Sequence, residues 1–326
     1  MGCLLSILSN IFKKIILKVF VIQLLLKNGI SNLKIKKVRF SEINLPFYGG
    51  GQFYLVNISV SLGSLGELST FSGMDKSFFL AINKCFSELC EGVTLVTTHN
   101  SLEPINRSGT SCHVNYINAA EKSYLELIER DAFLMHFLKP ELYSEILKRH
   151  ENNEITVVSN KLQTIDDQVT VVMSTIKEKS SGLFFIGLRA GKVSTTTEEL
   201  LIDSLLEATM LFKAQFLPEF TVLEPGSRRQ SLVDHLSASN EFKTRKAVEM
   251  IMSGGEGIHL MFQAPFDNFK VIERRNFVNR VVVRGKHASV LPLFFGKDWA
   301  QNKKLYEDKM MERKLAVSNW SVHPLL

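Results

Sequence analysis

The chain has 326 residues, 45% of them hydrophobic and 22% charged, with a formal net charge of +6. This composition excludes an intrinsically disordered chain, and the length allows one large domain or two ordinary ones. The positive charge is mild for this size, so it permits an anionic ligand such as a nucleotide but does not indicate a nucleic-acid-binding protein.

The first 26 residues are strongly apolar but include Lys13, Lys14 and Lys18. These charges leave too short an uncharged run for a transmembrane span. The pattern therefore favours a helix packed on its own domain, or an upstream extension, over an amphipathic helix resting on a membrane surface. Residues 27–326 are expected to form the main domain.

The four cysteines do not follow a metal-binding or disulfide pattern. They contain no CxxC pair, and no convincing signal peptide precedes them. We therefore expect reduced thiols and a cytoplasmic protein. The cysteines are Cys3, Cys85, Cys90 and Cys112.

Helical and extended segments follow one another without a linker. Extended segments are predicted at residues 27–40, 51–66, 155–159, 169–176, 182–188, 269–275, 278–285 and 289–296. Helices are predicted at residues 76–92, 117–138, 195–216, 233–252 and 297–315. The mixture predicts an α+β fold, because it lacks the regular strand–helix alternation of a doubly wound sheet.

The segment KSYLELIERDAF, residues 122–133, has the pattern of an amphipathic helix. Glu126 and Glu129 are three residues apart and therefore neighbours on one helical face. Two carboxylates placed in this way repel each other unless a positive charge lies between them. Arg130, next to Glu129, is a plausible partner for a phosphate group.

A second segment, AINKCFSELCEG at residues 81–92, repeats this frame and presents Glu88 and Glu91 at the same spacing. A third helical segment, LLIDSLLEATM, repeats it more faintly and presents Glu207. Carboxylates from several helices can bind divalent metal ions or act as an acid and base pair. Four or five carboxylates exceed what acid and base catalysis needs, so a magnesium–nucleotide site is the sharper hypothesis. The simpler alternative is that both pairs face water.

The usual phosphate-binding loop is missing. GLRAGKV, residues 187–193, has one residue too few between its glycines and no Ser or Thr after Lys192, so it is not a P-loop. If a nucleotide binds, magnesium held by carboxylates has to do much of what a glycine-rich loop does in other proteins.

Several segments resemble the signatures of YcaO-domain proteins. GTSCHVNYINAAEKSYLELIERDAF (109–133) is similar to the second signature, which ends in E-x-x-E-R-D-A. FSGMDKSFFLAINKCFSELCEG (71–92) resembles the first signature, and 197–213 resembles the third helix. VVVRGKHASVLPLFFG (281–296) and the closing SVHPLL are similar to the C-terminal part of the family. The resemblance covers about residues 27–326.

The resemblance implies an ATP-dependent enzyme that activates backbone amides of a ribosomally made precursor peptide, most simply to form thiazolines or oxazolines. A leader-binding partner protein and a homodimer are compatible with it. The resemblance also implies roles for individual residues. It implies metal ligands at Glu88, Glu91, Glu126 and Glu129, nucleotide contacts at Ser123, Arg130 and Glu207, and a catalytic end at His323 and Pro324.

The sequence also departs from the family pattern. The turn that precedes the first helix reads SGMDK where the family has G-K-G, Cys85 replaces a serine, and Gly92 replaces an arginine. These departures keep a second function open, that of a YcaO-like subunit that binds precursor peptide or a partner protein without turning over ATP.

Overall fold

The computed structural model describes residues 15, 19, 33–44, 51–62, 68–98, 108–214, 241–254, 257–264, 268–277, 279–293 and 301–321. The predicted N-terminal helix lies almost entirely outside this part of the chain. None of the helices within it is both long enough and apolar enough to cross a membrane.

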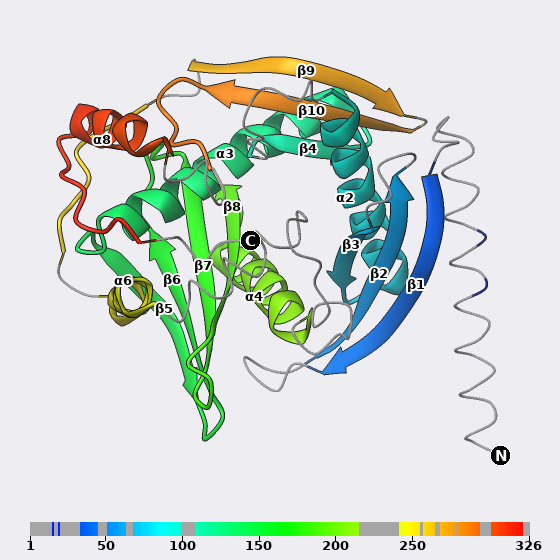
Figure 1. Ribbon diagram of the computed structural model, residues 1–326, viewed down its shortest axis with the longest axis horizontal. Helices are drawn as coiled ribbons and strands as arrows, with labels where there is room; N and C mark the ends of the chain where they lie inside the picture. Colours follow the sequence, from blue (N-terminus) through cyan, green and yellow to red (C-terminus); the bar gives the residue numbers. More distant parts are fainter. Residues whose placement is uncertain are drawn as a thin grey trace. The chain divides into compact units, whose positions relative to one another are not determined.

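Five helices and ten strands occur in the described residues. They carry the same labels in Figure 1. The helices are α2 (Phe78–Thr98), α3 (Tyr116–Leu138), α4 (Thr197–Ala214), α6 (Phe242–Ser253) and α8 (Lys303–Glu312). The strands are β1 (Leu33–Asn44), β2 (Gln52–Leu62), β3 (Leu68–Asp75), β4 (Thr110–His113), β5 (Ser144–Glu151), β6 (Ile155–Leu162), β7 (Val169–Glu178), β8 (Phe184–Lys192), β9 (Phe269–Phe277) and β10 (Arg280–His287).

The chain divides into two compact units. Unit 1 comprises Met1–Thr98, Ser111–Ala119 and Arg274–Val282, and unit 2 comprises the remaining residues. The chain passes from one unit to the other within β4, α3, β9 and β10. The strands β4, β10 and β9 form one three-stranded sheet in the order β4-β10-β9.

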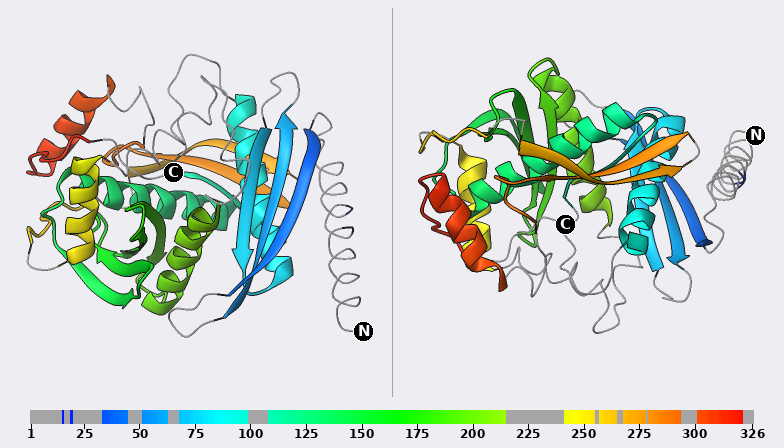
Figure 2. Two further views of the ribbon diagram at one scale, coloured as in Figure 1. Left: turned by 60° about the horizontal axis from the view of Figure 1, so that its bottom comes forward. Right: turned by 90° about the horizontal axis from the view of Figure 1, so that it is seen from above.

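Unit 1 is built on an antiparallel sheet in the order β1-β2-β3, against which α2 packs (Figure 2). Gly73 on β3 allows this close packing, because a Cβ there would lie 2.3 Å from the carbonyl oxygen of Ala81 on α2. Only glycine leaves room for so close a backbone approach. Apolar residues such as Ile58, Phe86 and Leu89 are buried between the sheet and the helix.

Unit 2 is built on an antiparallel sheet in the order β5-β6-β7-β8. Successive residues along each strand point to opposite faces of the sheet, and helices cover both faces. Leu188 belongs to the core that also contains residues of α3 and α6, whereas its neighbour Gly187 faces α4. Because successive strand residues point to opposite faces, α3 and α6 cover one face and α4 covers the other (Figure 1).

The contact between β8 and α4 is unusually close. A Cβ on Gly187 would lie 2.0 Å from the carbonyl oxygen of Ser204. Ser204 also takes part in a buried chain of hydroxyl groups, 2.7 Å from Ser174, which is 2.8 Å from Ser159 on β6. Small residues on both sides therefore bring α4 close to the edge of the sheet.

The observed elements confirm the α+β class and all five predicted helices within the described residues. Three strands, β3, β4 and β5, were not predicted. Residues 289–293, predicted to be extended, form a turn and coil instead, because side chains bind their main chain. Asp131 accepts from the amide of Leu291, and Arg313 donates to the carbonyl of Ser289.

Candidate functional site

Two predicted site residues, Glu129 on α3 and Glu207 on α4, meet at the free edge of β8. Glu129 Oε2 accepts a hydrogen bond of 2.9 Å from the amide of Ala190, and Glu207 Oε2 accepts one of 3.0 Å from the amide of Leu188. Amides two residues apart point to the same side of a strand. Helices on opposite faces of the sheet thus deliver one carboxylate each to the same edge.

Arg130 lies next to both carboxylates. Its Nε atom is 3.8 Å from Glu129 Oε1, and its Nη2 atom is 3.8 Å from Glu207 Oε1. Both separations exceed the range of a hydrogen bond, so they are charge contacts only. The side chain is 14% exposed, and among the described residues nothing accepts a hydrogen bond from its buried Nη1 atom.

The protonation equilibria at this edge are shifted. Burial raises the pKa of Glu129 above its ordinary value, and the neighbouring Glu207 raises it further, while Arg130 opposes the rise. Burial alone would lower the pKa of Arg130, but Glu129, Glu207 and Glu126 outweigh it and raise the pKa. Glu126 is half-buried on the same helix. The edge therefore gathers negative charge around Arg130, while Arg189 on β8 is close enough to lower the pKa of Glu129 as well.

The other carboxylate pair belongs to unit 1. Glu91 Oε1 accepts a hydrogen bond of 2.6 Å from the amide of Cys112 on β4, whereas Glu88 is exposed on α2. Glu91 is thus held by a strand amide in the same way as Glu129 and Glu207. The convergence of the two glutamate pairs on one metal site stays a prediction.

Ser123 has a clear structural partner in unit 2. Its buried hydroxyl donates a 2.5 Å hydrogen bond to the carbonyl of Gly109. The amide of Gly285 donates to the same carbonyl at 2.7 Å, and a Cβ on Gly285 would lie 2.6 Å from the Ser123 hydroxyl oxygen. The proposed nucleotide contact of Ser123 is not tested by this geometry. His323 and Pro324 lie outside the described residues.

Sequence reasoning missed the partner of Asp131, the residue after Arg130. Arg313 donates two hydrogen bonds to the Asp131 carboxylate, of 2.7 and 3.1 Å, and both side chains are almost fully buried. Asp131 also accepts a hydrogen bond of 2.7 Å from the amide of Leu291. The E-R-D-A pattern marked the aspartate, but nothing in the sequence marked an arginine 182 residues away.

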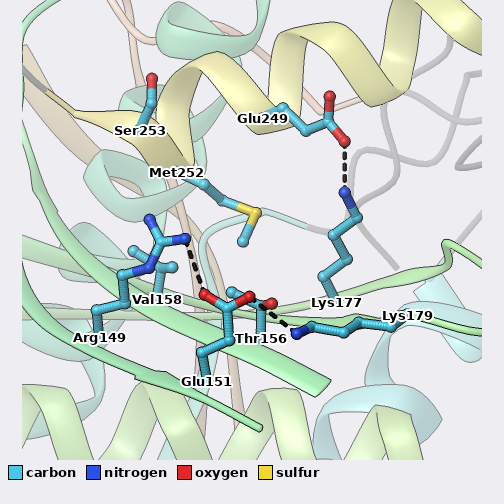
Figure 3. Close-up of a pocket in the computed structure, with 9 residues that line it drawn as sticks. All are labelled: Arg149, Glu151, Thr156, Val158, Lys177, Lys179, Glu249, Met252 and Ser253. Carbon is cyan, nitrogen blue, oxygen red and sulfur yellow. Dashed lines mark hydrogen bonds and ion pairs between the residues drawn. The ribbon is translucent and has the colours of Figure 1, made fainter. Parts of the chain in front are cut away.

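A hollow of about 350 Å³ lies beside α6, over β5, β6 and β7 (Figure 3). Its charged residues are already paired. Glu151 lies 3.1 Å from Arg149 and 2.8 Å from Lys179, and Glu249 lies 2.6 Å from Lys177. None of the predicted site residues lines it. The chemistry expected of this chain therefore does not belong to this hollow.

Comparison with solved structures finds YcaO from Methanopyrus kandleri, solved with AMPPCP and Mg²⁺ bound. The TM-score is 0.53 at 11% sequence identity, over 78% of this chain and 86% of that chain. This chain has a YcaO-like fold. No protein-family model and no curated protein matches the sequence. The likeness thus concerns the fold and supports the resemblance read from the signatures of the sequence.

The residues at the edge of β8 fit a magnesium–nucleotide complex in their chemistry. Carboxylate oxygens are the ligands that Mg²⁺ prefers, and a guanidinium nitrogen without an acceptor can donate to a phosphate oxygen. Within the described part of the chain, however, no three or more His, Cys, Asp and Glu side chains are arranged to hold a metal ion. The donor set therefore fits the group in its chemistry.

Proposed function

We propose that this protein is an ATP- and Mg²⁺-dependent enzyme that activates backbone amides of a ribosomally made precursor peptide. One observation carries the proposal: two carboxylates from opposite faces of a sheet meet beside Arg130, whose buried Nη1 atom has no acceptor among the described residues. The YcaO-like fold and the order of the sequence signatures support it.

In this proposal Glu126 and Glu129 hold magnesium and Arg130 binds phosphate. Glu207, which the resemblance assigns to the nucleotide, joins the metal ligands because it meets Glu129 at the edge of β8. ATP supplies the phosphoryl group that converts an amide oxygen into a leaving group. The chain's own residues position the reacting groups and neutralise negative charge on the transferred phosphoryl group.

The substrate chemistry we propose is azoline formation. A Cys, Ser or Thr side chain of the precursor attacks the preceding carbonyl carbon, and the former amide oxygen departs as phosphate. A thiazoline or oxazoline remains. We further propose a leader-binding partner protein that presents the peptide, and a cytoplasmic location. The described cysteines, Cys85, Cys90 and Cys112, are free thiols, as a reducing compartment requires.

Calorimetric titration of the full chain with ATP and Mg²⁺ tests the nucleotide site. We expect binding by the wild type and a loss of roughly tenfold or more in affinity for Glu129→Gln, whose amide oxygen can still accept from Ala190. Glu121→Gln is the matched control. Glu121 lies on the same helix but pairs at 2.8 Å with the exposed Lys192, so its loss should change affinity by less than about fivefold. A wild type that binds no nucleotide rules out the enzyme.

A second candidate function follows from the turn before α2. The turn reads SGMDK and lacks the lysine of the family's G-K-G. Its Asp75 pairs with Lys84 at 2.9 Å and accepts from the amide of Ser77, and a carboxylate does not replace a lysine as a phosphate ligand. This favours a subunit that binds precursor peptide or a partner without ATP turnover. Binding of precursor peptide by a wild type that does not bind ATP would support it.

A further inference from the structure

The two carboxylates at the edge of β8 divide their oxygens in the same way. Oε2 of each is bound to a β8 amide, at 2.9 Å for Glu129 and 3.0 Å for Glu207. Oε1 of each is directed at Arg130, at 3.8 Å in both cases. The strand therefore fixes the orientation of both carboxylates and leaves one oxygen of each for a positive charge.

Arg130 holds this position loosely. At 3.8 Å neither contact is a hydrogen bond, and no bidentate arrangement forms with either carboxylate. Its Nη1 atom is buried and, in the described part of the chain, has no acceptor. A buried guanidinium that is structural normally has its donors satisfied. Among the described residues, Arg130 meets the two carboxylates through charge contacts and not through hydrogen bonds, so another cation can compete for the same carboxylates.

A divalent ion bound at about 2.1 Å to Oε1 of either carboxylate would lie within about 6 Å of the Arg130 nitrogen that is 3.8 Å from that oxygen. The two cations repel each other at this range, so they compete for the same carboxylates.

We propose that Arg130 is a displaceable internal counter-ion. In the metal-free protein it neutralises Glu129 and Glu207, and it leaves them when a divalent cation enters. The departing guanidinium then binds the phosphates of the nucleotide. The displacement of Arg130 by a divalent cation does not depend on the proposed function. The binding of the displaced guanidinium to nucleotide phosphates rests on it. Its consequence is that metal binds weakly alone and tightly together with nucleotide.

Titration of the full chain with Mn²⁺ alone, followed by electron paramagnetic resonance of the free ion, tests the first half. Arg130→Gln should bind Mn²⁺ at least about tenfold more tightly than the wild type, because no competing cation remains. The control is Arg189→Gln, which removes the same charge from β8, where Arg189 lies 3.9 Å from Asp203. It should tighten Mn²⁺ binding by no more than about fivefold. Equal or weaker Mn²⁺ binding by Arg130→Gln overturns the inference.

Repeating the titration with AMPPCP separates this inference from the proposed function. In the wild type, AMPPCP should increase the affinity for Mn²⁺ at least about tenfold. In Arg130→Gln, AMPPCP should change the Mn²⁺ affinity little. If the wild type binds no nucleotide while Arg130→Gln still gains Mn²⁺ affinity, the proposed function is wrong and the counter-ion role of Arg130 is supported. If the wild type binds nucleotide but Arg130→Gln gains no Mn²⁺ affinity, the counter-ion role is wrong and the proposed function is supported.

Folding of the variant is checked by circular dichroism and thermal unfolding. If Arg130→Gln does not fold, Arg130→Met replaces it, because the unbranched apolar chain fills the space of the arginine stem. Arg130→Lys retains the charge and should keep the weak Mn²⁺ binding of the wild type. A lysine variant that binds Mn²⁺ as tightly as the glutamine variant contradicts the proposed competition between cations.

Discussion

Two ion pairs on neighbouring residues of α3 are built in opposite ways. Arg130 lies 3.8 Å from each of two carboxylates and has a buried nitrogen without an acceptor in the described residues. Asp131 receives two hydrogen bonds from Arg313 and one from the amide of Leu291. Because successive helical residues point about 100° apart, the two side chains face different surroundings.

The difference separates a pair with fully matched hydrogen bonds from the group that we propose to be functional. The Asp131 pair satisfies its partners and ties α3 to residues 289–291 and 313, which are distant in sequence. The Arg130 group is incompletely satisfied, and unsatisfied buried donors are uncommon in structural networks. In our proposal, α3 thus presents one surface that fixes the fold and another that binds a ligand.

The largest expected effect is on the structural side of this comparison. Asp131→Ala leaves Arg313 buried and without its carboxylate, so the free energy of unfolding should fall by about 3–5 kcal/mol. Urea denaturation measures it. Glu121→Gln, which breaks an exposed pair on the same helix, should cost about 1 kcal/mol or less. Similar losses in the two variants would show that the buried pair has no special structural role.

A smaller effect is expected where α4 meets β8. In Gly187→Ala the new methyl group meets the Ser204 carbonyl at 2.0 Å, so α4 must shift away from the strand. We expect a loss of about 1–3 kcal/mol in the free energy of unfolding, together with weaker metal binding, because Glu207 moves with α4.

The control for this substitution is Gly191→Ala on the same strand. Its Cβ would meet the end of the Leu200 side chain at 2.8 Å and the Thr195 side chain at 3.0 Å. Side chains yield more easily than backbone, so stability should fall less. Metal binding by Gly187→Ala that equals the wild type would mean that Glu207 is not positioned by this packing.

The smallest effect concerns pH on the functional side. The pKa of Glu129 is raised in the folded protein, mainly by burial. The folded state therefore binds this proton more tightly than the unfolded state, and stability falls as pH rises from the ordinary glutamate range through the raised pKa. Glu129→Gln removes this contribution. Both proteins are unfolded with urea at several pH values. The free energy of unfolding of the variant should rise relative to that of the wild type as pH rises. A difference in free energy that does not change with pH would contradict a raised pKa of Glu129.

The local pattern of the sequence was sufficient for the helices. Pro140 indicated where α3 ends, and apolar periodicity predicted its start to within one residue of Tyr116. It was insufficient for β5, whose segment SEILKRHE alternates weakly because it lies at the sheet edge. It also gave the wrong conformation for residues 289–293, where side chains from distant segments bind the main chain.

The candidate site was predicted in part. Spacing placed Glu126 and Glu129 on one helical face, and the faint third frame singled out Glu207. The role of β8 was not foreseen, because GLRAGKV was examined as a phosphate loop and not as a strand edge whose amides hold carboxylates. Its Gly187 serves close packing and not phosphate binding.

The sequence by itself determined the α+β class, the helices and which carboxylates stand out on them, because these depend on periodicities of a few residues. Only the tertiary structure decided that Glu129 and Glu207 meet at one strand edge, that Arg130 lies between their free oxygens, and that Asp131 belongs to Arg313. The contacts with β8 and with Arg313 join residues between 19 and 182 positions apart, and they depend on which face of the sheet each helix covers. No local pattern records such distances, because packing brings the partners together only after the helices and strands have formed.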